Sequence, residues 1–192
     1  MMERVPSKTR KQIGLILASI HTGSSPTLWK SVHAEAVQQG FDLFVFPGGP
    51  LEKDESYERQ RNCIFPLVQT FLQKGFLDGI ISWASSLGGK VPVETITDFH
   101  QAFRSFPCVT LSYPVEGLPC IWIDAYEGMK KLLDHFLDEH RVRSFAFIRG
   151  PATHISAEER YRAFRDTLRE RGKELLFKTR LAGLFIWLFV KR

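Results

Sequence analysis

Short apolar runs rich in β-branched residues alternate along this chain with longer segments of helical period. The first run, residues 13–18, is followed by a segment in which Leu28, Val32 and Ala36 recur on one helical face. The same alternation continues to about Gly172. Because parallel strands require a crossover of a dozen or more residues between them, this pattern is typical of βαβ units. It predicts an α/β fold with a doubly wound parallel sheet.

The individual elements can be placed from the same pattern and from turn and capping residues. Strands are expected at residues 13–18, 43–46, 78–82, 108–111, 121–123 and 144–148. Helices are expected at residues 25–39, around 64–72, at 93–104, after Asp124 and after Ser156. Ser25, Asp124 and Ser156 are the expected caps of their helices, Pro66 is expected to kink or restart its helix, and residues 85–89 are expected to form a flexible loop.

The two ends of the chain lie outside this regular pattern. We expect a disordered tail at residues 1–11 and an atypical apolar tail at residues 173–192. Within that tail, LAGLFIWLFV is too short to span a bilayer and too apolar to remain in water. It is either an ordinary buried terminal strand or helix, or the end of a truncated chain with no native place for it. We favour the second interpretation.

Composition narrows the class of protein. The formal charge of +5 is mildly basic, but Lys and Arg are dispersed among acidic residues, which argues against a nucleic-acid surface. Cys63, Cys108 and Cys120 form no CxxC pair and lie in apolar or strand-like surroundings, as expected in the reducing cytoplasm. No apolar run reaches the roughly 18 residues needed to cross a membrane, so no membrane contact is expected.

Enzyme motifs are absent from the places where this fold would carry them. The loop after the first strand reads SIHTGSSP, which is neither GxGxxG nor a Walker A sequence, and no GxSxG elbow occurs. The segment from Pro47 to Pro50 loosely resembles the glycine loop of amidotransferases, but Cys63 lacks the glycine-flanked turn of such a nucleophile. The six histidines show no metal-ligand spacing. We therefore expect no enzyme, no cofactor and no metal.

Several segments together resemble a known family. IGLILASIHTGSSPTLWKSVHAEAVQQGFDLFVF, FLDGIISWAS, PCVTLSY, CIWIDAYEGMKKLLDHFLDEHRVRSFAFIRGP and SAEERYRAFRDTL are similar in order and spacing to the effector-binding domain of LacI/GalR regulators and their periplasmic sugar-binding relatives. The resemblance covers about residues 12–172. It implies two α/β lobes, the first at residues 12–143 and the start of the second at residues 144–172, where the chain of such proteins crosses near the sixth strand. It also implies a ligand held between the lobes, a place that open parallel sheets favour.

The resemblance also implies candidate ligand contacts. The SxxxR pattern of the family falls on Ser156 and Arg160, where an arginine typically donates hydrogen bonds to a sugar or another polar effector. Its alternative is a solvated arginine, and helix capping alone would explain Ser156. Further candidates lie in the loops expected at the cleft, each with a purely structural alternative: Trp83, which could stack on a sugar or purine, His21, His154 and Ser112. Ser112 stands where many sugar-binding relatives carry an aspartate, a departure from the hexose-binding pattern. Asp124 matches a family aspartate but is explained by capping.

The expected function is therefore the sensing of a small polar effector, a sugar or a nucleobase-like molecule. The family commonly forms homodimers. Only about a dozen residues precede the first strand, so no helix-turn-helix and no direct DNA binding are expected from this chain. With the second lobe incomplete, we expect weak binding or none. The alternatives are the sensor part of a signalling protein and a structural or dimerising remnant that binds no ligand.

Overall fold

The first 120 or so residues fold around a five-stranded parallel sheet. Its strands are β1 (Lys11–Leu17), β2 (Phe41–Pro47), β3 (Gly79–Ser82), β4 (Cys108–Leu111) and β5 (Cys120–Ile121). They lie in the order β2-β1-β3-β4-β5, and each neighbouring pair runs parallel. Ile80 and Ile121 thus belong to one sheet. The doubly wound parallel sheet inferred from the sequence is confirmed.

The computed structural model describes residues 10–52, 55–88, 91–150, 154–173, 177–181 and 184–190, with side chains as far as Lys173. The chain divides into two compact units, Met1–Trp122 and Ile123–Arg192, which are treated separately below. Most of the disordered tail expected at residues 1–11 lies outside the described residues, although Lys11 already belongs to β1.

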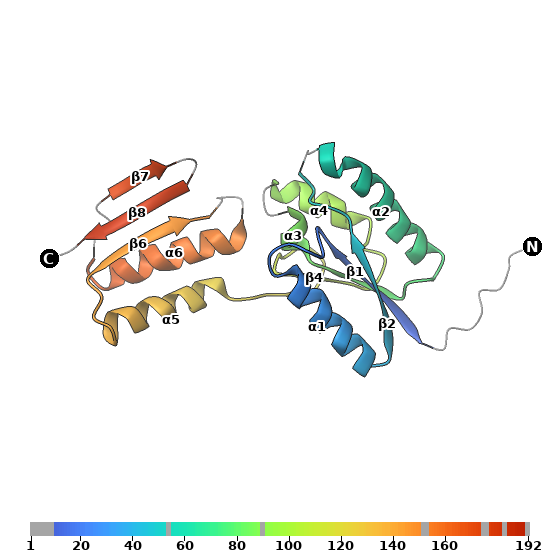
Figure 1. Cartoon of the computed structure of the whole chain (residues 1–192), viewed down its shortest axis with the longest axis horizontal. Helices are drawn as coiled ribbons and strands as arrows, with labels where there is room; N and C mark the ends of the chain where they lie inside the picture. The colour runs from blue at the N-terminus through green and yellow to red at the C-terminus, as the bar shows by residue number, and fades with distance from the viewer. Residues whose placement is uncertain are drawn as a thin grey trace, which may run out of the picture. The chain divides into compact units, whose positions relative to one another are not determined.

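Helices cover both faces of the sheet of unit 1. The helices are α1 (Ser25–Gln38), α2 (Glu55–Gln73), α3 (Ala84–Gly88) and α4 (Val93–Gln101). Figure 1 shows α1 on one side of the sheet and α2 and α4 on the other. The core lies between the sheet and α2, where buried apolar side chains form one cluster: Ile16, Phe46, Phe65, Val68, Leu72, Leu77, Ile80, Leu87, Phe103 and Cys108. Burial of this apolar surface is the main force that holds the unit together.

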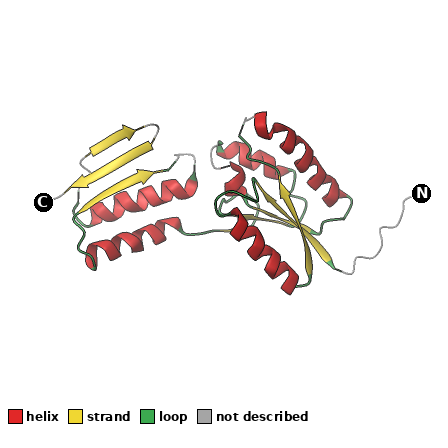
Figure 2. Cartoon of the chain, viewed as in Figure 1, coloured by secondary structure: helices red, strands yellow, loops and turns green. Residues whose placement is uncertain are grey.

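Unit 2 consists of two helices and a small antiparallel sheet. Its elements are α5 (Ala125–Asp138), β6 (Ser144–Arg149), α6 (Ile155–Glu170), β7 (Phe177–Leu181) and β8 (Leu184–Val190), with strand order β6-β8-β7 (Figure 2). Leu133, Phe164 and Leu168 are buried together, and Phe145 and Phe147 of β6 pack against them. Contacts between α5 and α6 complete the unit.

The position of α5 moves the boundary between the two units. The sequence analysis expected the chain to cross near Ser144, whereas the compact units separate between Trp122 and Ile123. The reason is that α5 packs on α6: the Arg171 guanidinium is 2.6 Å from Asp134 and 2.8 Å from Asp138, and Lys130 is 3.2 Å from Glu170. These contacts attach α5 to the elements that follow it.

The apolar segment near the C-terminus has a place in unit 2, contrary to the preferred expectation. β8 pairs antiparallel with the whole of β6, from Ser144 opposite Val190 to Arg149 opposite Phe185. β7 pairs with the other edge of β8. A lone β6 would leave a row of unpaired backbone N–H and C=O groups, and β8 satisfies one such row. The backbone pairing of residues 184–190 agrees with the strand of the alternative expectation, whereas the burial of its side chains lies outside what the structure describes.

Four local expectations need correction and one is confirmed. Residues 84–88 form the short helix α3 and not a flexible loop. α2 continues through Pro66, so the helix does not restart there. Proline has no N–H to donate to the carbonyl of Asn62 one turn earlier, and because Asn62 is exposed that carbonyl can bind water. The caps of α1 and α6 are Ser24 and His154 with no side-chain cap bond, so Ser25 and Ser156 are not caps. Asp124 does cap α5, its carboxylate accepting from the Glu127 amide at 2.8 Å.

Candidate functional site

The carboxyl edge of the sheet in unit 1 gathers three of the residues predicted from the sequence. β1 leads to β2 on one side, and the chain then returns to place β3 on the other side of β1. In open α/β sheets, ligands bind outside the carboxyl ends of the strands where the strand order reverses in this way. His21 follows β1, Trp83 follows β3 and Ser112 follows β4, so all three lie at this edge.

Hydroxyl and amide groups fix the loop after β3 to β1. The Trp83 amide donates to the Ile16 carbonyl at 2.8 Å, which continues the parallel ladder one residue beyond β3. The Ser86 hydroxyl accepts from the Ala18 amide at 3.2 Å and donates to the Trp83 carbonyl at 2.8 Å. Trp83 itself is half-buried. The indole is thus held on a loop with a defined backbone, which suits a stacking residue.

The residue before Trp83, Ser82, forms a buried pair with His100. The Ser82 hydroxyl is 2.8 Å from Nε2 of His100, and Nδ1 of His100 is 2.7 Å from the Ile96 carbonyl. Both residues are fully buried. Since a carbonyl can only accept, Nδ1 carries the proton, and the Ser82 hydroxyl therefore donates to Nε2. Burial lowers the pKa of His100, and the hydrogen bond to Ile96 opposes this shift.

The loop after β4 holds a strained serine and a buried tyrosine. Ser112 has a φ of 56°, a left-handed conformation uncommon for a serine, and its amide donates to the Ile121 carbonyl at 2.9 Å. The neighbouring Tyr113 is buried, and its hydroxyl has no hydrogen-bond partner within the described part of the chain. Burial raises the pKa of Tyr113, and the nearby Glu94 carboxylate adds to this.

His21 is exposed at the same edge. Its backbone amide donates to the Ser19 hydroxyl at 3.1 Å, a local turn bond that leaves the imidazole facing solvent. The loop is further held where the Trp29 indole donates to the Ile20 carbonyl at 3.3 Å. His21 is therefore available to a ligand, and nothing in its surroundings requires a histidine there.

The other three residues lie at the start of α6 in unit 2. His154 is the cap residue, Ser156 lies in the first turn, and Arg160 follows one turn later. The structure brings these three together, while His21, Trp83 and Ser112 belong to the other unit. The predicted site residues therefore form two groups, one in each unit.

Arg160 has no hydrogen-bond or ion-pair partner in the described part of the chain, whereas three of its charged neighbours on α6 each have a partner. It is exposed, and neither a hydrogen bond nor an ion pair joins it to the described residues. Three neighbours are engaged elsewhere: Glu158 pairs with Arg149, the Arg162 guanidinium lies 5.0 Å from the centre of the Tyr126 ring, and Arg165 is 3.0 Å from Asp166. The planar donor fork of Arg160 is thus free to bind a ligand.

His154 and Glu159, both half-buried, lie near Arg160. Burial lowers the pKa of His154, and the positive charge of Arg160 lowers it further. Burial also raises the pKa of Glu159, and Asp124 adds to the rise, while Arg162 and Arg160 oppose it. His154 Nδ1 and Glu159 Oε2 have no hydrogen-bond partner among the residues that the structure describes. A polar ligand could complete their hydrogen bonding.

Metal-binding clusters, membrane-spanning helices and pockets are three further features that bear on function in the described part of the chain. Among the described residues, no group of three or more His, Cys, Asp or Glu side chains is placed to hold a metal ion. No helix in the described part of the chain is long and apolar enough to cross a membrane. A pocket of about 280 Å³ in unit 2 lies near the C-terminal ends of α5 and α6 and is lined by none of the predicted site residues.

The sequence pattern did not indicate the roles of Ser82, His100 and Tyr113. Ser82 ends β3 and is a hydroxyl residue directly before Trp83, which could have drawn attention to it. His100 gave no signal, since its spacing matches no motif and only the packing of α4 brings it to Ser82. Tyr113 follows Ser112, and its burial could not be read from the chain.

The fold defined here is that of known regulators. The chain matches a periplasmic binding protein/LacI transcriptional regulator from Alkaliphilus metalliredigens, crystallised with D-xylulofuranose, with a TM-score of 0.60 and 21% identity over 85% of this chain and 54% of that one. It matches the trehalose repressor of Escherichia coli with a TM-score of 0.61 and 14% identity over 85% and 57% of the two chains. The chain thus has the fold of LacI-type effector domains, and the resemblance inferred from the sequence is confirmed.

A curated relative points the same way. The ribose operon repressor of Halalkalibacterium halodurans is 27% identical over 165 residues, which are 85% of this chain and 44% of the repressor. The chain therefore spans about half the length of the relatives it matches. These relatives are transcription regulators and binding proteins, and none of those named here is an enzyme. No family model matches the sequence.

Proposed function

We propose that this chain is a sensing domain for a small polar effector, a sugar or a nucleobase-like molecule, in a regulator of the LacI type. The observation that carries the proposal is Arg160, a guanidinium on the first turns of α6 without a partner among the described residues, while Glu158, Arg162 and Arg165 are engaged elsewhere. The similarity to a ribose operon repressor supports a sugar as the effector. The protein acts as a binding module and not as an enzyme.

The two groups of site residues have different roles in this proposal. Arg160 anchors the effector through charge-assisted hydrogen bonds, and Ser156 and His154 add polar contacts from the same helix end. In unit 1, taken by itself, Trp83 is the proposed stacking residue, and His21 and Ser112 are the proposed contacts to hydroxyl groups at the carboxyl edge of the sheet. We also propose that the chain works in the cytoplasm and pairs as a homodimer.

Thermal-shift and calorimetric titrations with pentoses, hexoses and purines test the proposal. We expect at least one sugar to stabilise the chain weakly, and Arg160→Ala to lower the affinity for that sugar by roughly tenfold to a hundredfold, the range for hydrogen bonds to a charged group. Arg165→Ala is the matched control, because it removes the same charge from the same helix while its partner is only the adjacent Asp166. Stabilisation by no compound, or equal binding by the Arg160 variant, would instead favour a dimerising unit without a ligand.

A further inference from the structure

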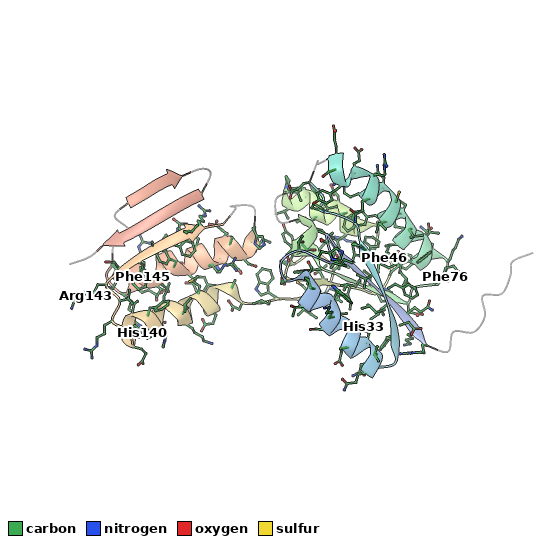
Figure 3. All side chains as sticks on the ribbon, viewed as in Figure 1. His33, Phe46, Phe76, His140, Arg143 and Phe145 are labelled. Atoms are coloured by element: carbon green, nitrogen blue, oxygen red, sulfur yellow. The ribbon has the colours of Figure 1, made fainter. Side chains whose placement is uncertain are left out.

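Two histidines meet at the C-terminal end of α5, whereas the proposed effector contacts of unit 2 lie at the start of α6. His135 lies in the last turn of α5, and His140 lies just beyond its end, where Figure 3 labels it. Their Nε2 atoms are 3.0 Å apart, and their rings are nearly perpendicular, with centroids separated by 4.7 Å. Both side chains are exposed.

The backbone fixes this approach. The amides of Glu139 and His140 both donate to the His135 carbonyl, at 3.0 and 3.4 Å, and so turn the chain back on the helix end. The Val142 amide then donates to the Phe136 carbonyl at 3.0 Å. Arg141 completes the turn in a left-handed conformation with a φ of 51°. His140 is thus returned towards His135 by a turn that the main chain defines.

Two imidazole nitrogens at this distance need a proton or a metal ion between them. If both Nε2 atoms were unprotonated, their lone pairs would repel each other at 3.0 Å. A neutral imidazole that carries its proton on Nε2 relieves this by donating a hydrogen bond to the other ring, and a metal ion bound by both nitrogens relieves it equally. The pair is therefore close enough to act as two ligands of one metal ion once both Nε2 atoms are unprotonated.

The distance also suits a metal ion. A metal–nitrogen bond of 2.0–2.1 Å places two neighbouring imidazole nitrogens about 2.9 Å apart in square or octahedral geometry and about 3.4 Å apart in tetrahedral geometry. The observed 3.0 Å falls within this range. The end of a helix carries a partial negative charge and the exposed Glu139 carboxylate is adjacent, which favour a cation, whereas the positive charge of Arg141 beside His140 opposes one.

We propose that His135 and His140 bind one divalent transition-metal ion, with water in its remaining positions. Imidazole pairs suit Ni²⁺, Cu²⁺ and Zn²⁺. With two protein ligands and exposed rings, the ion exchanges with solvent and clips the turn after α5 to the helix, unlike a closed four-ligand structural site. This proposal is independent of the effector site on α6.

Titration of the full chain with NiCl₂ alone tests the proposal by calorimetry. Ni²⁺ is preferred over Cu²⁺ because Cys63 is an exposed free thiol that Cu²⁺ would oxidise. We expect one Ni²⁺ per chain, and at least a tenfold loss of affinity in both His135→Gln and His140→Gln. His33→Gln is the matched control, since His33 is exposed on α1, and it should bind as the parent does.

The double variant distinguishes a shared site from two separate histidines. If both rings hold one ion, His135→Gln with His140→Gln together should be no weaker than either single change. Absence of Ni²⁺ binding by the parent chain, or equal loss in the His33 variant, would overturn the proposal. So would a double variant whose losses simply add. Far-UV circular dichroism of each variant shows that the fold is retained, because both histidines lie on the surface.

Discussion

His100 is the residue whose protonation should matter most for unit 1. Its lowered pKa means that the unfolded chain binds a proton more readily than the folded one. The resulting stability is present above the ordinary histidine pKa of about 6.5 and is lost as the pH falls below it. The loss has a ceiling of about 1.4 kcal/mol per pH unit for one proton.

The pH dependence can be measured by urea unfolding at pH 7.5, 6.5 and 5.5. We expect stability to fall over this range in the parent chain and to fall less in His100→Asn, which cannot take up a proton. His154, whose pKa is also lowered, adds a contribution of the same sign from unit 2, and His154→Asn separates the two. An unchanged slope in the His100 variant would show that the buried pair is not the source.

Gly48 and Gly128 form a matched pair of glycines with opposite expected outcomes. A Cβ at Gly48 would lie 2.2 Å from the buried Phe65 ring, whereas a Cβ at Gly128 meets nothing within 4 Å. We expect Gly48→Ala to destabilise by about 1–3 kcal/mol through overpacking. Gly128→Ala in helix α5 should stabilise by about 0.5–1 kcal/mol. Chemical denaturation measures both, and equal effects would contradict the packing described for Phe65.

At the residue scale, the sequence foresaw groups that act locally. Asp124 as the cap of α5 follows from its position three residues before Glu127. Ser156 was misassigned because α6 begins at Ile155, and the capping box pattern does not reveal which of two polar residues starts the helix. The bond between Ser82 and His100 depends on tertiary packing, which spacing cannot show.

At the element scale, β8 is the strand that makes the small sheet of unit 2. It lies between β6 and β7, so alternate residues of β8 pair with one neighbour and then with the other. Ile186→Pro and Trp187→Pro should therefore each remove one backbone hydrogen bond of the sheet. One variant should lose a bond to β6 and the other a bond to β7.

Amide hydrogen exchange resolves the two variants. We expect one of Ile186→Pro and Trp187→Pro to lower protection in β6 and the other to lower it in β7, with β1 of unit 1 unchanged as the internal control. Equal protection of β6 in the parent and in both variants would show that β8 does not pair with it.

The element types of residues 11–121 were largely predictable because βαβ periodicity is strong there, whereas the pairing partner of a terminal apolar block is not encoded in its own pattern.

At the scale of the whole molecule, two separate cores should respond to core damage separately. Phe103 is fully buried in unit 1, and Phe164 is buried in unit 2. Each Phe→Ala change should cost about 3–5 kcal/mol. Hydrogen exchange should locate each loss in its own unit, and a loss spread evenly over both units by either variant would contradict the division at Trp122.

The order of strands in unit 1 also governs how the chain folds as it is made. β1 pairs with β2 about 30 residues later and with β3 about 66 residues later, as in Lys11 opposite Phe41 and Ile13 opposite Gly79. Synthesis proceeds at roughly 5–20 residues per second, so one edge of β1 stays bare for several seconds after β2 has emerged. During that interval an apolar strand is open to pairing with another nascent chain. An interior strand of the finished sheet is thus an exposed edge, and so an aggregation hazard, in the unfinished one.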